Sequence, residues 1–221
     1  MNPINGLLQK DYLLLKSYSK NLVVCLAIFV ALIVSQSYDD GMSSIGAVMI
    51  MLVFSMLVLS TFSYDEKSKA DRYLLTLPIS RKEIIIEKYI LSLLSLIIGT
   101  LVGSMISLGL IYFLLGEIPD IEENLSMILG GMVGVALIQA IQLPCIYKWG
   151  AEKGRIQIYI IGMVIFVVGI LLSTFAPELN LSHSFLLTLS KFIPVICIGL
   201  IAIIYFISYK ISYKIYKKKE Y

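Results

Sequence analysis

The chain has 221 residues, of which 58% are hydrophobic and only 15% are charged. Soluble domains carry roughly 25% charged residues, and disordered chains combine high charge with low hydrophobicity. The formal net charge of +3 is small, and no basic patch alternates with stacking aromatic residues. These numbers exclude a soluble globule, a disordered chain and a nucleic-acid binder. Together with a mean hydropathy of +0.89, they indicate a single transmembrane domain over residues 1–221.

Six apolar runs approach or exceed the length of about 20 residues that a helix needs to cross a bilayer. The predicted spans are residues 21–37, 42–63, 88–115, 124–147, 157–175 and 192–209. None has an acidic or basic residue in its interior, and none shows the sustained alternation of barrel strands. The sequence therefore predicts an all-α integral membrane protein with six transmembrane helices.

The basic residues fix the expected orientation. All but one of the 18 Lys and Arg residues lie at the two ends of the chain or in the connections after the second and fourth spans. The exception, Lys191, lies in the outer connection 176–191, and the other outer connections are acidic. Because basic residues concentrate on the cytoplasmic side, we expect both termini in the cytoplasm.

The N-terminal segment, residues 1–20, is expected to form an amphipathic helix that lies in the membrane interface. At helical spacing, Ile4, Leu7 and Leu8 share one arc with later apolar residues. Asp11 is an exception because it falls within the apolar arc. The alternative interpretation is a solvated leader into the first span.

The segment 64–88, which includes the connection 64–82, is the longest soluble segment and is expected in the cytoplasm. Its pattern predicts two helices with a corner between them. The first helix ends before Pro78, which disfavours helical geometry in the preceding residue. Ser80 and Glu83 have the spacing of a capping box, which starts the second helix. Such a short, defined element could dock to another protein, or it could lie on the lipid headgroups.

The run 74–83, Leu-Leu-Thr-Leu-Pro-Ile-Ser-Arg-Lys-Glu, followed by Lys88 and Tyr89, resembles the cytoplasmic loop of type-2 ABC transporter permeases. Lys10 and Asp11, followed by leucines, resemble the interface helix of the same family, and the six-span plan agrees over the whole chain. Among its members, the short permeases of peptide and antimicrobial-peptide exporters are most similar. The resemblance implies half of a dimeric export path, with an identical or homologous second permease subunit in the lipid bilayer of a bacterial plasma membrane.

The resemblance also implies that this loop is the coupling helix, which contacts a separate ABC ATPase present in two copies. Leucines and a proline would fill a groove on the ATPase, and charged residues would set the register at its rim. The residues carried over are Asp65, Glu66, Arg72, Leu74, Leu75, Leu77, Pro78 and Arg81.

No catalytic, metal-binding or cofactor-binding residues are predicted in this chain. It lacks the Gly-x-x-x-x-Gly-Lys-Ser/Thr loop that cradles nucleotide phosphates. ATP and magnesium are therefore expected at the partner ATPase, and the chain is not expected to be an enzyme. An intramembrane enzyme or an ion-coupled carrier would need ionisable groups at membrane depth, and the predicted spans contain none.

Small and amide residues in the third and fourth spans are candidates for helix packing or for the translocation path. Glycine at four-residue spacing lets helices approach closely, and buried amides need partners in hydrocarbon. The candidates are Gly99, Gly103, Gly130, Gly134, Gln139 and Gln142. A path without fixed charge suits an amphipathic peptide, a lipid or a drug. The remaining alternatives are the substrate-binding membrane component of a vitamin importer and a non-transporting sensor or immunity protein.

Overall fold

The computed structural model describes residues 3–36, 42–74, 76–115, 121–154 and 183–218, together with residues 156, 160, 162–164 and 167. Every regular element in these residues is a helix, which confirms the all-α prediction for this part of the chain. The helices are α1 (Pro3–Gln36), α2 (Met42–Lys67), α3 (Ala70–Leu74), α4 (Arg81–Leu115), α5 (Ile121–Trp149) and α7 (His183–Lys217).

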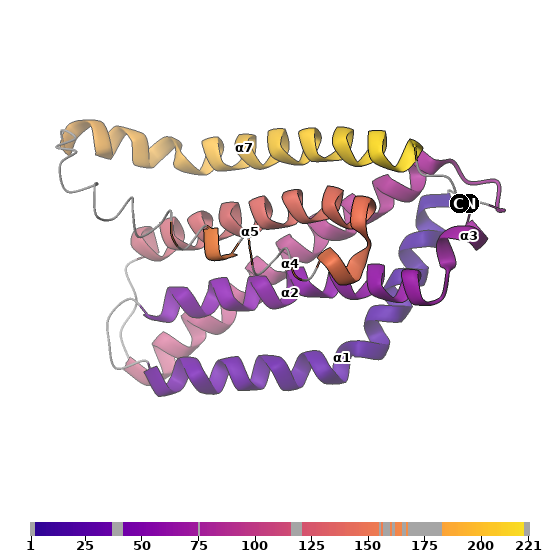
Figure 1. The fold of residues 1–221 in the computed structure, drawn as a ribbon. Coiled ribbons are helices and arrows are strands. Elements are labelled where there is room, and N and C mark those ends of the chain that lie inside the picture. Colours follow the sequence, from indigo (N-terminus) through magenta and orange to yellow (C-terminus); the bar gives the residue numbers. More distant parts are fainter. Residues whose placement is uncertain are drawn as a thin grey trace.

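The long helices form one bundle in which α2 and α4 pack against each other at the centre (Figure 1). Helix α1 packs on both of them from one side, and α5 and α7 pack together on the other side. The start of α1, the short helix α3 and the end of α7 lie at one end of the bundle (Figure 1), which we call the α3 end. That this end faces the cytoplasm stays a prediction from the basic loops.

Four of the described helices are long and apolar enough to cross a membrane: Gly46–Lys67, Arg81–Gly109, Ile128–Trp149 and Val195–Lys217. They correspond to the second, third, fourth and sixth predicted spans. Residues 21–36 of the first predicted span are helical and form the later part of α1. The fifth predicted span, 157–175, and the first residues of the outer connection 176–191 lie almost wholly outside the described residues. Six spans therefore stay a prediction.

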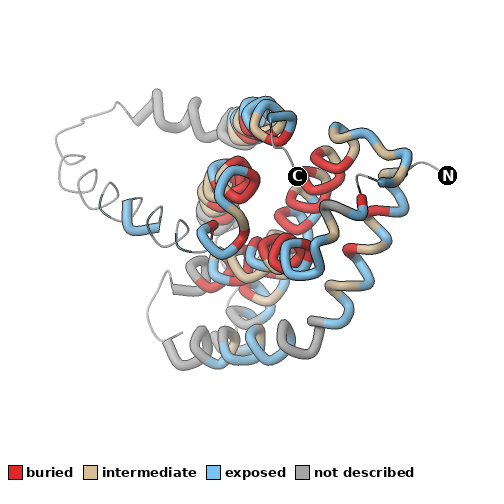
Figure 2. The backbone as a smooth tube through the Cα atoms, turned by 45° about the vertical axis from the view of Figure 1, so that its right-hand side comes forward, coloured by how far each residue is buried: buried red, intermediate tan, exposed pale blue. Residues whose placement is uncertain are grey.

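The outer faces of these helices are strongly apolar. Met105 and Phe113 on α4 are 74% and 85% exposed, and Val195 and Ile203 on α7 are 69% and 62% exposed. Figure 2 shows the buried residues on the inward-facing sides of the helices. A water-soluble protein with such a surface would aggregate, whereas lipid chains cover it without cost. The bundle is built to sit in a bilayer.

The residues expected to form the interface helix are the first part of α1, which runs on without interruption and changes direction on its way (Figure 1). Leu7 and Asp11 are buried against the neighbouring helices, whereas Tyr12 and Leu13 are exposed. Asp11 therefore faces inward together with the apolar arc, which explains its position in the helical pattern.

Helices α2 and α4 approach closely because two glycines of α4 lie at their contact. A Cβ atom on Gly103 would lie 2.8 Å from the backbone oxygen of Ala47, and one on Gly99 would lie 2.9 Å from the Cβ atom of Phe54. Both distances are shorter than van der Waals contact allows. The packing role predicted for these two glycines is therefore found between α4 and α2.

Gly130 and Gly134 of α5 behave differently from the two glycines of α4. A Cβ atom on either would meet nothing within 4 Å among the described residues. The glycine of α5 that contacts a neighbour is instead Gly131, whose missing side chain makes room for Val48 of α2. Close packing of Gly130 and Gly134 against another helix is therefore absent from the described structure.

Polar side chains bridge α4, α5 and α7 inside the apolar bundle. Gln139 of α5 donates a hydrogen bond to Ser95 of α4 at 3.2 Å and accepts one from the hydroxyl of Tyr205 of α7. On the next turns, the Tyr89 hydroxyl of α4 lies 2.6 Å and 2.8 Å from those of Ser208 and Ser212 of α7. Hydrocarbon offers no competing partners, so these bonds fix how α7 packs on α4 and α5.

Gln142 is also buried, but its amide nitrogen has no hydrogen-bond partner among the described residues. It lines a small cavity beside Gln139, Ser55 and Ser92. The two predicted amides thus have different surroundings. Gln139 joins three helices, whereas Gln142 faces a cavity about the size of one water molecule.

The two glycine pairs lead to a direct test of helix packing. We expect Gly103→Ala to lower the stability of the detergent-solubilised protein by about 1–3 kcal/mol, because the new methyl group would collide with the backbone of α2. Gly134→Ala is the matched control and should leave the melting temperature unchanged or slightly raised, since alanine favours helix more than glycine. Thermal unfolding followed by size-exclusion chromatography would measure both. Equal melting temperatures for the two variants would contradict this packing.

Candidate functional site

A cluster of charged side chains joins α1, α2 and α4 at the α3 end. The ammonium group of Lys88 on α4 lies 2.5 Å from Oδ2 of Asp11 on α1 and 2.7 Å from Oδ2 of Asp65 on α2. Lys10 completes the cluster, with its ammonium 2.7 Å from Oδ1 of Asp65 and 3.1 Å from Oδ1 of Asp11. Two lysines and two aspartates, contributed by three different helices, thus form one set of ion pairs.

Three of the four side chains in the cluster are buried, so their charges are costly unless they are paired. Asp11 is 0% exposed, Lys88 3% and Asp65 6%. Lys88 also donates a hydrogen bond to Oγ1 of Thr61 and lies over the ring of Phe62. Buried charges are tolerated only when they are paired and hydrogen-bonded, so each helix needs the other two at this point.

The pKa of Asp11 is subject to two opposing influences, which are burial and the neighbouring positive charges. Burial would raise the pKa of this carboxyl, but the positive charges of Lys88 and Lys10 and the hydrogen bond from Lys88 outweigh it, and the pKa lies below its ordinary value. Asp11 is therefore ionised at neutral pH. The stability that its pairs provide is present above the ordinary carboxyl range and is lost as the pH falls through the lowered pKa.

The corner between α3 and α4 is held by the predicted capping box. The backbone N–H and the hydroxyl of Ser80 each donate to Oε2 of Glu83 at 2.7 Å, and the Glu83 N–H donates to Oγ of Ser80 at 3.3 Å. The preceding turn is closed by a hydrogen bond from the Leu77 N–H to the carbonyl of Leu74. These bonds confirm that the helix after Pro78 begins at a capped serine.

Arg81, at the start of α4, holds the end of α7. Its guanidinium donates to the backbone carbonyls of Tyr216 and Lys217, at 3.3 Å and 3.0 Å. The last carbonyls of a helix lack partners within the helix, and a cation there is favoured by the helix dipole. The beginning of α4 is therefore joined directly to the C-terminal end of the bundle.

Glu66 joins α2 to the turn that follows α5. Its carboxylate accepts a hydrogen bond of 2.6 Å from the backbone N–H of Ala151. Gly150 has a φ of +89°, and a Cβ atom there would lie 2.7 Å from Oε1 of Glu66. Glycine is required at this turn both by its backbone conformation and by the close approach of the carboxylate.

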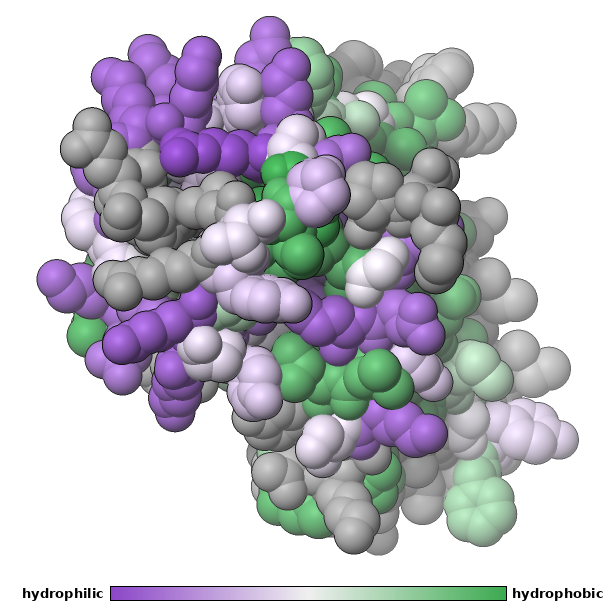
Figure 3. Space-filling model, turned by 90° about the vertical axis from the view of Figure 1, so that its right-hand side faces the viewer, coloured by the Kyte–Doolittle hydropathy of each residue, from purple (hydrophilic) through white to green (hydrophobic). Residues whose placement is uncertain are grey.

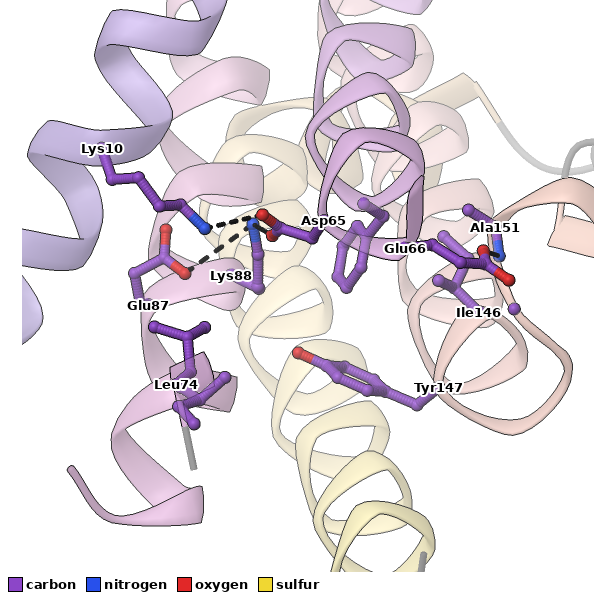
Figure 4. Close-up of a pocket in the computed structure, with 12 residues that line it drawn as sticks. Lys10, Asp65, Glu66, Leu74, Glu87, Lys88, Ile146, Tyr147 and Ala151 are labelled. Atoms are coloured by element: carbon purple, nitrogen blue, oxygen red, sulfur yellow. Dashed lines mark hydrogen bonds and ion pairs between the residues drawn. The ribbon is translucent and has the colours of Figure 1, made fainter. Parts of the chain in front are cut away.

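A pocket of about 70 Å³ lies between these connections (Figure 4). Lys10, Glu87 and Lys88 lie on one side of it, and Glu66 and Ala151 lie on the opposite side. Apolar and aromatic side chains form the rest of its wall: Phe62, Leu74, Ile84, Ile146 and Tyr147. Figure 3 looks onto the α3 end, where hydrophilic side chains surround apolar patches.

The structure places several of the predicted coupling residues inside the protein. Asp65 was expected to pair with a partner at the rim of a groove, but it is 6% exposed and pairs with Lys10 and Lys88 of its own chain. Leu74 was expected to enter a groove on the partner, but it is also 6% exposed and lines the pocket. Both side chains are therefore used by the bundle itself in this conformation.

Other predicted residues remain at the surface or outside the described residues. Pro78 is exposed, Leu77 is half-buried, and Glu66 is exposed although it bonds to Ala151. Leu75 and the side chain of Arg72 lie outside the described residues. Among the described apolar coupling residues, Pro78 and the exposed part of Leu77 are thus available to a partner.

The sequence alone does not predict the buried charge cluster, because Lys88 and Asp65 lie at the ends of apolar runs, a position typical of loop residues. One signal was visible: Asp11 interrupts the apolar arc of the N-terminal helix. An ionised carboxylate on a buried helix face requires a cationic partner, and Lys88 is that partner of Asp11.

The comparison with known families agrees with this architecture. The family model for ABC-2 family transporter proteins matches residues 6–217, which is nearly the whole chain. The chain belongs to the ABC-2 transporter family. No curated protein matches it.

Membership in this family makes the chain a permease subunit of an ABC transporter and a multi-pass membrane protein. Members of this family are membrane components of ABC transporters, which are normally non-catalytic and work with an ATPase partner. Within the described residues, no group of three or more His, Cys, Asp or Glu side chains could hold a metal ion.

The charge cluster leads to a prediction about stability. We expect Lys88→Met to destabilise the protein by about 3–5 kcal/mol, because it leaves buried carboxylates without their cation. Lys67→Met is the control, since Lys67 is an exposed lysine at the end of α2. Thermal unfolding in detergent would measure both variants. A melting temperature of Lys88→Met equal to that of Lys67→Met would contradict the pairing.

A second prediction concerns the contact between Glu66 and the turn after α5. We expect Glu66→Ala to raise the rate of trypsin cleavage after Lys153 several-fold, because the turn loses a hydrogen bond worth about 1 kcal/mol. Glu66→Gln keeps an acceptor oxygen and should stay close to the unmodified protein. If cleavage of all three proteins proceeded at one rate, the bond would have no role in holding this turn.

Proposed function

We propose that this chain is the membrane-spanning permease subunit of an ATP-driven ABC exporter, forms half of a dimeric translocation path, and is coupled to a separate ATPase subunit. The family match over residues 6–217 is the observation that carries the proposal, since it makes the chain an ABC permease subunit. ATP hydrolysis, with its magnesium, is assigned to the partner. The bacterial plasma membrane is the proposed location.

The geometry of the α3 end supports the site of coupling. The turn around Leu77 and Pro78 projects from α3 and leads without a gap into α4, which is capped at Ser80. A push on this turn would therefore move a 35-residue helix directly. Arg81 and Glu66 would pass the same movement to α7 and to the turn after α5.

The proposed cargo is an amphipathic peptide, a lipid or a drug. The helices that cross the membrane join through hydroxyl and amide groups in the middle of the bundle, such as Ser95 and Gln139. The buried charges lie at the α3 end instead. A path between helices whose described residues carry hydroxyl and amide groups but no charges at this depth favours uncharged or amphipathic cargo over ions.

The first test is to identify the partner. The tagged chain, purified in mild detergent from its native host, should bring down an ABC ATPase in stoichiometric amount. A chain that purifies without an ATPase, even after mild crosslinking, would contradict the proposal and would favour a sensor or immunity role.

The second test addresses the turn itself. We expect Leu77→Asp to abolish the response of ATP hydrolysis to assembly with the permease and to reduce ATPase co-purification at least tenfold, because a charge replaces an apolar contact. Leu77→Met keeps an apolar side chain of similar size and should retain both. Membrane insertion of each variant is checked by its yield and its melting temperature. Unchanged coupling in an inserted Leu77→Asp protein would show that the turn is not the contact.

A further inference from the structure

The carboxyl groups in the buried cluster at the α3 end outnumber the ammonium groups. Beside the two lysines and two aspartates of the cluster, Glu87 of α4 is 1% exposed and lies next to them. Among the described side chains, three buried carboxyl groups therefore share two ammonium groups, of which that of Lys88 is buried and that of Lys10 is partly exposed. If all were ionised, the cluster would hold one uncompensated negative charge, which buried sites tolerate poorly.

The groups that face Glu87 come from several elements. Lys10 and Asp11 approach from α1, Asp65 and Glu66 from α2, and Tyr147 from α5. Lys88 is its neighbour on α4, and α3 contributes the apolar side chain of Leu74. The only cations among these groups are Lys10 and Lys88, both already bound to aspartates.

The geometry shows which carboxyl lacks a cation. The Lys88 ammonium lies 2.5 Å and 2.7 Å from Asp11 and Asp65 but 4.0 Å from Glu87. Oε1 of Glu87 receives no hydrogen bond from a donor in the described part of the chain. The Glu87 and Asp11 carboxyl groups both approach the ammonium group of Lys88. Two neighbouring carboxyl groups can form a hydrogen bond with each other only when one of them carries a proton.

We propose that Glu87 binds a proton that it donates to the Asp11 carboxylate, and that this proton is a regulatory ligand that holds the α3 end closed. With the proton in place, the cluster is electrically neutral and α1, α2 and α4 stay joined. When the proton leaves Glu87 for water, one negative charge remains in the cluster, and repulsion from Asp11 and Asp65 loosens it. The regulatory meaning rests on the proposed coupling function, whereas the proton site does not.

The pocket gives this proton a route and connects it to the loop. Glu87 and Leu74 line the same cavity of about 70 Å³ (Figure 4), which is large enough to hold water. Loss of the proton would draw more water to Glu87, in the space against which Leu74 packs. The pH on the α3 side would thereby control how firmly the loop is held.

The test compares the unmodified protein with Glu87→Gln, an uncharged mimic of the protonated side chain, between pH 6 and pH 9. The purified chain is used alone, so the result does not depend on any partner. We expect the unfolding constant of the unmodified protein to rise by up to tenfold per pH unit relative to that of Glu87→Gln while the folded protein still holds the proton that the unfolded chain has released, and to level off once the folded protein also loses it. Glu152→Gln, which removes an exposed carboxylate, should follow the unmodified protein.

Two further results decide the proposal. Trypsin cleavage within the loop should accelerate with pH in the unmodified protein relative to Glu87→Gln at the same pH, a ratio that removes the pH dependence of trypsin. The infrared band of a protonated carboxyl should be present at pH 7 in the unmodified protein and absent from Glu87→Gln.

Parallel pH profiles for the unmodified protein and Glu87→Gln would overturn the proposal. So would a Glu87→Gln protein that is less stable at pH 6, because that would show that the ionised form of Glu87 is needed. Should Glu87→Gln fail to fold, the infrared band of the unmodified protein alone decides: its absence at pH 7 overturns the proposal.

Discussion

The ammonium group of Lys88 is the point on which the α3 end depends. It lies at the beginning of the longest apolar stretch of α4, yet it is buried between carboxylates of α1 and α2. Removing a lysine from water costs several kcal/mol, and only direct pairing offsets that cost. Because the two aspartates come from different helices, the pairing is satisfied only when α1, α2 and α4 assemble in one arrangement.

Around this cluster, each connection at the α3 end is joined to another. Ser80 and Glu83 fix the corner into α4, Arg81 caps α7, and Glu66 holds the turn after α5. A force on one connection therefore reaches helices on both sides of the bundle. The proposed coupling to a partner at this end requires such connections. The hydroxyl and amide bonds further along α4, α5 and α7 hold these helices in register.

Local signals in the sequence were enough to predict much of this structure. Pro78 and the Ser80–Glu83 spacing located the corner before α4. The spacing of Gly99 and Gly103 was typical of a close helix contact, and the structure shows that the neighbouring helix is α2. Gly130 and Gly134 have the same spacing but meet no neighbour among the described residues, because spacing alone does not say which face of a helix is covered. The roles of Asp65 and Leu74 depend on contacts between residues distant in sequence, which periodicity cannot reveal. Asp11 was the exception to the helical pattern, and only the structure identifies its partner, Lys88 on α4.

The measurement that tests the central claim most directly is a photo-crosslink from the exposed turn. A photoreactive amino acid placed at Pro78 in the full chain, activated in native membranes, reports what the turn touches. The account predicts one major adduct, with an ABC ATPase, and none from the same amino acid placed at Met105, whose side chain projects from the outer face of α4. An adduct at Pro78 with lipid alone, or with a protein that is not an ATPase, would contradict the account.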